Sequence, residues 1–143
     1  MLRKIKKYNL PVKDLVLIYT GYIRPILEYC APVFHSGLTI EQNSNIERIQ
    51  KRVCKIILGP LYISYSNACQ LCNLSTLQER RLALCRSFAK SLPNNPTCRN
   101  WLPPRKHVKI SLRHTSTFHQ YKFKTKRFQN SPLSFLVNLL NQI

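Results

Sequence analysis

Residues 46–59 read Ile46-Glu47-Arg48-Ile49-Gln50-Lys51-Arg52-Val53-Cys54-Lys55-Ile56-Ile57-Leu58-Gly59. Five aliphatic side chains recur at the spacing that gathers residues onto one face of an α-helix: Ile46, Ile49, Val53, Ile56 and Ile57. A cationic set follows the same period on another face: Arg48, Arg52 and Lys55, with Lys51 beside them. The pattern predicts an amphipathic helix with one face for a hydrophobic core and another for an anion.

Signals on both sides set the limits of this helix. Thr39 and Gln42 have the spacing of a capping box, in which the hydroxyl accepts a hydrogen bond from a first-turn amide and the glutamine reaches back. Gly59-Pro60 predicts its end, because glycine tolerates a left-handed closing residue and proline cannot continue a helix.

Helical segments are also predicted before the central helix. A basic stretch at 1–8 resembles the last turns of a helix, and an apolar-periodic helix follows over 12–27. Pro25 should kink this helix or divide it in two. Arg24 and Glu28 stand four residues apart and can form an ion pair across one turn.

The segments after the central helix are also helical in pattern. A short helix is expected over 66–71, and Ser75 with Gln78 forms a second candidate capping box for a helix that ends at Pro93. We expect that helix to carry four cations on its outer side: Arg80, Arg81, Arg86 and Lys90.

The predicted fold is all-α. It comprises a small helical bundle over residues 1–92, a basic and largely irregular Pro-rich segment over 93–130, and a short C-terminal helix over 131–143 that opens at Ser131-Pro132. Basic residues alternate in the irregular segment with aromatic ones that could either stack on unpaired bases or form a hydrophobic patch: Phe118, Tyr121, Phe123 and Phe128.

Charge is the most extreme property of the composition. The chain has 23 Lys and Arg against 5 Asp and Glu, a net charge of +18. Such an excess indicates a polyanionic partner, nucleic acid first and an anionic membrane surface second. All five acids precede Arg80, so the second half has no carboxylate side chains for acid–base chemistry or for magnesium. We therefore expect no polymerase or nuclease chemistry contained within this chain.

The six cysteines need a compartment before they can be interpreted. No secretory signal is evident, which favours free, mostly buried thiols in a reducing, intracellular location, either nuclear or cytoplasmic. Residues 15–34 contain Arg24, Pro25 and Glu28, so we predict no membrane span. Cys69 and Cys72 with His114 and His119 offer a zinc set, but the separation far exceeds that of a zinc finger, so no metal site is predicted.

Three blocks of the sequence carry a family resemblance. They are Tyr19-Thr20-Gly21-Tyr22-Ile23-Arg24-Pro25-Ile26-Leu27-Glu28-Tyr29-Cys30-Ala31-Pro32-Val33, the stretch from Ile46 to Arg52 that closes at Ile56-Ile57-Leu58-Gly59, and Leu77-Gln78-Glu79-Arg80-Arg81. In order and spacing they resemble the region downstream of the palm in reverse transcriptases of non-LTR (LINE-type) retrotransposons. The resemblance covers about residues 1–92.

The resemblance implies the thumb and the region after it, a helical element that grips the template–primer duplex of an RNA-directed DNA polymerase. The family's aromatic-Ala-Asp-Asp signature is absent, since the chain has no Asp-Asp and Asp14 is its only aspartate. We therefore expect a C-terminal piece that begins inside a helix, is non-catalytic alone and has no cofactor, because magnesium would belong to the absent palm. Its expected partners are an RNA–DNA hybrid or duplex and the palm, without a membrane.

The residues expected to contact phosphates are Arg48, Lys51, Arg52, Lys55, Arg80 and Arg81. Three alternatives stay open: solvated helix faces without a ligand, a degenerate cationic scaffold that binds a protein or an anionic membrane, and a chain that does not fold stably. The oligomeric state is open as well.

Overall fold

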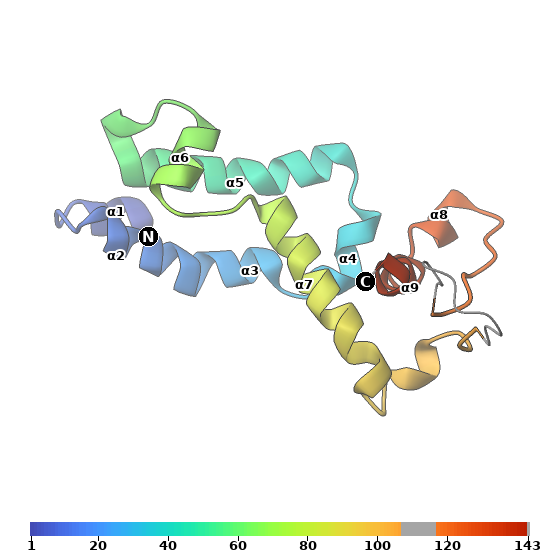
Figure 1. Ribbon diagram of the computed structural model, residues 1–143. Helices are drawn as coiled ribbons and strands as arrows, with labels where there is room; N and C mark the ends of the chain where they lie inside the picture. Colours follow the sequence, from blue (N-terminus) through green and yellow to red (C-terminus); the bar gives the residue numbers. More distant parts are fainter. Residues whose placement is uncertain (107–116, 143) are drawn as a thin grey trace. The chain divides into compact units, whose positions relative to one another are not determined.

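The computed structural model describes residues 1–106 and 117–142 (Figure 1). The all-α prediction is confirmed, since these residues form helices and no strand; the nearest approach to a sheet is an isolated bridge between Arg105 and Phe118. The chain folds into two compact units: unit 1 comprises Met1–Tyr29 and Thr39–Arg80, and unit 2 comprises Cys30–Leu38 and Arg81–Ile143. The predicted boundaries at residues 92 and 130 do not coincide with this division.

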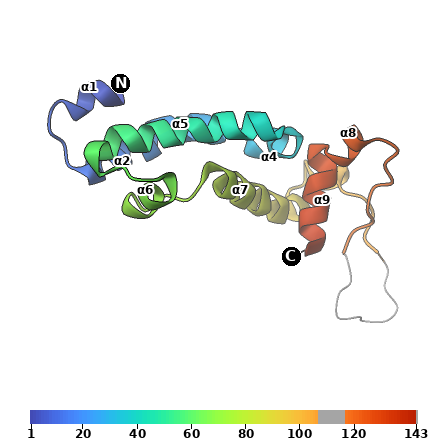
Figure 2. The same ribbon diagram turned by 90° about the horizontal axis from the view of Figure 1, so that it is seen from above.

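Unit 1 is built around α5, a helix of 19 residues that runs unbroken from Ile40–Leu58 (Figure 2). Its other elements are α1 (Leu2–Lys6), α2 (Val12–Ile18), a π-helical segment (Tyr19–Ile23), α3 (Arg24–Glu28), a 3₁₀ turn (Gly59–Leu61), α6 (Tyr65–Leu71) and the first turn of α7 (Leu77–Ser91). Helices α1, α2 and α6 all pack on α5. The core of unit 1 is formed where they meet, by Leu2, Leu15, Tyr19, Val53, Cys54, Ile57, Leu58, Ala68, Cys72 and Leu74.

Pro25 divides the long N-terminal helix, as predicted. The backbone widens into a π-helical turn over Tyr19–Ile23, where the Arg24 amide donates to the Tyr19 carbonyl, five residues back, and α3 begins directly after it. A proline has no amide hydrogen and its ring collides with the carbonyl four residues earlier, so a wider turn before Pro25 relieves both problems. Arg24 and Glu28 form the expected ion pair, with 3.7 Å between Nε and Oε1.

Both ends of α5 carry the predicted signals. The Gln42 amide donates to Thr39 Oγ1 at 3.1 Å and the Thr39 amide donates to Gln42 Oε1 at 3.0 Å, which completes the capping box. Gly59 closes the helix with a φ of +58°. Lys6 Nζ donates to the Ile56 carbonyl in the last turn of α5. A cation at this position also interacts favourably with the negative end of the helix dipole. Helix α1 is thereby tied to the C-terminus of α5.

The buried face of α5 differs from the predicted one. Its buried side chains are Gln50, Val53, Cys54, Ile57 and Leu58. Of the predicted aliphatic stripe only Val53 and Ile57 are buried, while Ile49 is 42% exposed. Compared with the prediction, the face that carries Gln50 and Cys54 is turned toward the core. It is turned inward because the Gln50 amide forms hydrogen bonds inside unit 1.

The capping box of α7 is shifted by one residue from the predicted one. Glu79 N donates to Thr76 Oγ1 at 3.2 Å and Thr76 N donates to Glu79 Oε2 at 3.1 Å. The prediction of Ser75 and Gln78 was therefore wrong. The Ser75 carbonyl instead accepts from the Gln50 side chain, which fixes the backbone one residue before the cap. Helix α7 ends at Ser91, and Pro93 lies in the 3₁₀ turn that follows.

Unit 2 contains α4 (Ala31–Phe34), 3₁₀ turns at His35–Gly37, Leu92–Asn94 and Arg99–Trp101, most of α7, α8 (Lys126–Gln129) and α9 (Pro132–Gln142). The predicted C-terminal helix is therefore confirmed as α9. The core of unit 2 comprises Cys85, Ala89, Leu92, Cys98, Leu136 and Leu139. The Asn141 side chain makes two hydrogen bonds to the backbone of Phe118, at 2.9 and 3.1 Å, so α9 holds a segment that is otherwise irregular.

The closing residue of α5 allows a test with opposite signs. We predict that Gly59→Ala lowers the free energy of unfolding by about 1–2 kcal/mol, because an alanine is strained at positive φ and its Cβ would lie 2.9 Å from Lys6 Nζ. In the control, Gly21→Ala, the added Cβ has nothing within 4 Å, and the gain in helix propensity should raise stability by about 0.5–1 kcal/mol. Urea denaturation measures both changes, and equal effects would contradict this account of Gly59.

Candidate nucleic-acid interface

A buried amide fixes the orientation of α5. Gln50 is fully buried. Its Oε1 accepts from the Tyr19 hydroxyl at 2.6 Å, and its Nε2 donates to the Tyr65 hydroxyl and to the Ser75 carbonyl, both at 2.9 Å. One side chain of α5 thus joins the π-helical turn, α6 and the segment that leads into α7. A buried amide this well satisfied stabilises one rotation of the helix over the others, because any rotation would leave polar groups unpaired.

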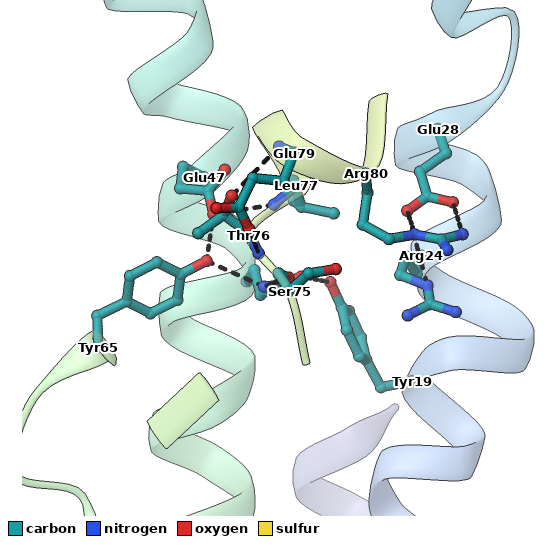
Figure 3. Close-up of polar contacts among 11 residues, drawn as sticks. Tyr19, Arg24, Glu28, Glu47, Tyr65, Ser75, Thr76, Leu77, Glu79 and Arg80 are labelled. Atoms are coloured by element: carbon teal, nitrogen blue, oxygen red, sulfur yellow. Dashed lines mark hydrogen bonds and ion pairs between the residues drawn. The ribbon is translucent and has the colours of Figure 1, made fainter. Parts of the chain in front are cut away.

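Glu47 extends this network by one helical turn. Its carboxylate accepts hydrogen bonds from the Tyr65 hydroxyl and, at 3.1 Å, from the Leu77 amide (Figure 3). A carboxylate at the first amide of α7 satisfies a donor that has no partner within the helix and favours the positive end of its dipole. Burial raises the pKa of Tyr19 above its usual value, and burial together with the bond to Glu47 raises that of Tyr65. Both phenols therefore stay protonated donors.

With Gln50 and Cys54 turned inward, the cationic stripe of α5 faces solvent. Arg48, Lys51, Arg52 and Lys55 are all exposed; we call these four residues the α5 cationic face. Within the described part of the chain, Arg48 and Arg52 form no ion pair. The two lysines lie over aromatic rings, Lys51 Nζ at 5.2 Å from the centre of the Tyr65 ring and Lys55 Nζ at 5.3 Å from that of Tyr62. Cation–π contacts of this kind orient the ammonium groups without neutralising them.

The expectation that Arg80 and Arg81 lie on the outer face of α7 was wrong for Arg81, and Arg80 is partly exposed but paired with an acid. The Arg80 guanidinium makes two hydrogen bonds to Glu28, both at 3.0 Å, from Nε and Nη2 (Figure 3). Arg81 is fully buried. It lies on the buried face of α7, four residues after Leu77 and four before Cys85. The sequence did not indicate this position, because a charged residue is expected to be exposed. The structure therefore groups only the four α5 residues of the six predicted.

The cysteines of unit 1 are buried free thiols. Burial, reinforced by the neighbouring Cys72 and Cys69, raises the pKa of Cys54 to about 12, and burial raises that of Cys85 in unit 2 to about 11. Thiols with raised pKa values are poor nucleophiles at neutral pH. His114 of the considered zinc set lies outside the described residues, and within those residues no three His, Cys, Asp or Glu side chains are grouped to hold a metal.

The aromatic residues of unit 2 are only partly available for stacking. Phe118 is buried, with the Arg105 guanidinium 5.8 Å from its ring centre. The Tyr121 hydroxyl donates to the Trp101 carbonyl at 2.7 Å, and its ring meets Phe128 edge-on. Phe123 and Phe128 are the more exposed of the four. The burial of Phe118 and the hydrogen bond of Tyr121 favour the interpretation of these two residues as a hydrophobic patch over that of a stacking surface for bases.

Comparisons with protein-family models, with curated proteins and with solved structures found no match to this chain. Within the part of the chain that the structure describes, no helix has the length and hydropathy needed to cross a bilayer.

Replacing the buried amide tests whether it fixes α5. We predict that Gln50→Leu lowers the free energy of unfolding by about 3 kcal/mol, because the buried Tyr19 hydroxyl and the partly buried Ser75 carbonyl lose their hydrogen-bond partner. The matched control is Gln70→Leu on α6, which is exposed and should change stability by less than about 0.5 kcal/mol. Chemical denaturation of both variants measures the difference, and similar values would show that the Gln50 network does not stabilise the fold.

We predict that the buried Cys54 thiol makes the free energy of unfolding fall at alkaline pH. Its folded-state pKa is raised from 9.0 to about 12, so its contribution is full below pH 9 and is lost as the pH rises from 9 toward 12. The unfolded chain releases the proton first, so deprotonation favours unfolding. Denaturation midpoints at a series of alkaline pH values should fall less steeply for Cys54→Ala than for the wild type. Replacing the exposed Cys30 by serine should leave the slope unchanged, and parallel slopes for all three proteins would refute the prediction.

Proposed function

We propose that the α5 cationic face binds the phosphate backbone of a nucleic acid, and that the chain is a non-catalytic C-terminal fragment of a retrotransposon-type RNA-directed DNA polymerase. The observation that carries the binding proposal is the exposure of Arg48, Lys51, Arg52 and Lys55 on one helix face without a facing acid. The assignment to the polymerase family rests on the sequence resemblance alone.

The positions of the acids support this proposal. Glu28 pairs with Arg80, Glu47 belongs to the Gln50 network and Glu79 completes the capping box of α7. The remaining two, Asp14 and Glu41, lie in the first turns of α2 and α5, where helix dipoles favour them. Three of the chain's 5 carboxylates thus make contacts within unit 1, and none of these contacts is with the α5 cationic face.

The spacing of the cations also favours an anionic ligand. Arg48 and Arg52 stand four residues apart, as do Lys51 and Lys55, and like charges at this spacing repel each other by about 0.2–0.5 kcal/mol per pair. A row of phosphates placed between them would remove this repulsion and release condensed counterions. Arginine forks and lysine ammonium groups on a helix contact backbone oxygens without reading bases, which suits recognition of an RNA–DNA hybrid by its shape.

One observation favours a second function, the binding of a protein partner. Four large apolar side chains are at least 70% exposed along α2, the π-helical segment, α3 and the residue that follows it: Leu17, Tyr22, Ile26 and Tyr29. Exposed apolar rows of this kind are common at protein–protein contacts. In a parent polymerase such a partner would be the palm; in the alternative function, a degenerate cationic scaffold, it would be another protein or an anionic membrane.

Charge removal tests the proposal. We predict that changing all four residues of the α5 cationic face to glutamine weakens binding to an RNA–DNA hybrid on the order of a hundredfold, and lowers the salt slope of log affinity by up to about 3.6, at about 0.9 per phosphate contact. The matched control changes four other exposed cations to glutamine: Lys4, Lys13, Arg86 and Lys90. Fluorescence anisotropy at several salt concentrations measures both quantities, and thermal melts show that the variants fold.

The control separates a defined surface from net charge. Equal losses in the two quadruple variants would show that the hybrid senses only the overall charge. Wild-type binding that is absent or independent of salt would refute the proposal. Tighter binding to phosphatidylserine vesicles than to the hybrid would favour the cationic scaffold.

A further inference from the structure

A second cationic feature of unit 1 lies where α1 packs against the end of α5. Four basic side chains and Ile56 line an open pocket of about 340 Å³: Arg3, Lys6, Lys7 and Lys55. The pocket belongs to a single unit, because α1 and α5 are both parts of unit 1. Neither Arg3 nor Lys7 is among the residues that the sequence pattern indicated.

Helix α1 is held in place by contacts that leave its cations at the pocket. Leu2 is buried in the core of unit 1 and Ile5 packs against that core. Lys6 donates to the Ile56 carbonyl and is thereby committed to the fold. Arg3 and Lys7 stand four residues apart, so they share a helix face, and both are exposed. The pocket thus has one cation bonded to the fold, Lys6, and three that form no ion pair within the described residues, of which Lys55 lies over the Tyr62 ring.

The pocket has no negative charge of its own. None of the five acids of the chain lines it, and within the described residues Arg3, Lys7 and Lys55 form no ion pair. Three converging cations repel each other, and a dianionic or bridging oxyanion relieves that repulsion. An arginine fork accompanied by lysine point charges is a combination that suits phosphate oxygens.

We infer that Arg3, Lys7 and Lys55 bind a phosphate group in this pocket, as the continuation of the α5 cationic face. The inference rests on the proposed function, since Lys55 belongs to both surfaces. From Arg48 to Lys55 the helix advances about 10 Å at 1.5 Å per residue, and a duplex whose axis runs along α5 places about three phosphates of one strand in that length, at 3.4 Å of axis per phosphate. A backbone that follows the face from Arg48 therefore reaches the pocket, where the next phosphate meets Arg3 and Lys7.

A double variant tests the pocket apart from the face. In Arg3→Gln/Lys7→Gln, affinity for the RNA–DNA hybrid should fall about fivefold to tenfold, and the salt slope should fall by about 0.9, for the one phosphate that both residues contact. The matched control is Lys4→Gln/Lys13→Gln, which removes two exposed cations of unit 1 that do not line the pocket. Lys6 is left unchanged because it holds α1 on α5. Circular dichroism and thermal melts establish that both variants fold.

The outcomes separate this inference from the proposed function. If the wild type binds the hybrid and the two double variants lose equal affinity and slope, the pocket is refuted while the α5 cationic face stands. If the wild type does not bind the hybrid at all, the proposed function is refuted. A second measurement tests whether the pocket also binds free phosphate: the ³¹P NMR signal of inorganic phosphate broadens when phosphate binds the protein. Broadening by the wild type that Arg3→Gln/Lys7→Gln abolishes shows a site for free phosphate; a loss confined to the hybrid shows a site for backbone phosphate; no difference in either assay overturns the inference.

Discussion

The hydrogen bonds of the Gln50 amide are the constraint on which the rest of unit 1 depends. A primary amide is costly to bury, and this one is accepted because Tyr19, Tyr65 and Ser75 supply partners from three separate segments. Those partners exist in one rotation of α5 only. The same rotation buries Cys54 and Ile57 and turns the four cations of α5 to solvent. An apolar core alone would permit several helix rotations, whereas hydrogen bonds with fixed directions select one.

The fold uses its few acids in a consistent way. In a chain with a net charge of +18, each carboxylate is a scarce partner. Glu28 of α3 accepts hydrogen bonds from Arg80 of α7. Glu47 of α5 accepts a hydrogen bond from the first amide of α7. Acids therefore join helices, and the four residues of the α5 cationic face, which form no ion pair within the described residues, remain exposed. Such a division explains how a chain with this much self-repulsion can be compact and still present cationic surfaces.

Local signals in the sequence were predictable and non-local ones were not. The Thr39–Gln42 box, the positive φ of Gly59 and the break before Pro25 depend on residues within a few positions of each other, so their chemistry is legible in the sequence. The burial of Gln50 depends on Tyr19, 31 residues away, and on Tyr65, 15 residues away. Arg81 shows the same limit, because periodicity placed it on the buried line of α7 while its charge predicted exposure.

The candidate site inherits this division between local and non-local information. The cationic period of α5 was visible in the sequence, but the pocket at Arg3 and Lys7 required the packing of α1 on α5. In both places the side chains proposed to bind phosphate lie outside the buried network and outside both cores. Their charges repel one another, and the cation–π contacts of Lys51 and Lys55 contribute only modestly to the stability of the folded state. Under the proposed function, stability and binding are separable properties in unit 1, because the Gln50 network lies in the interior and the cations proposed to bind phosphate lie outside it.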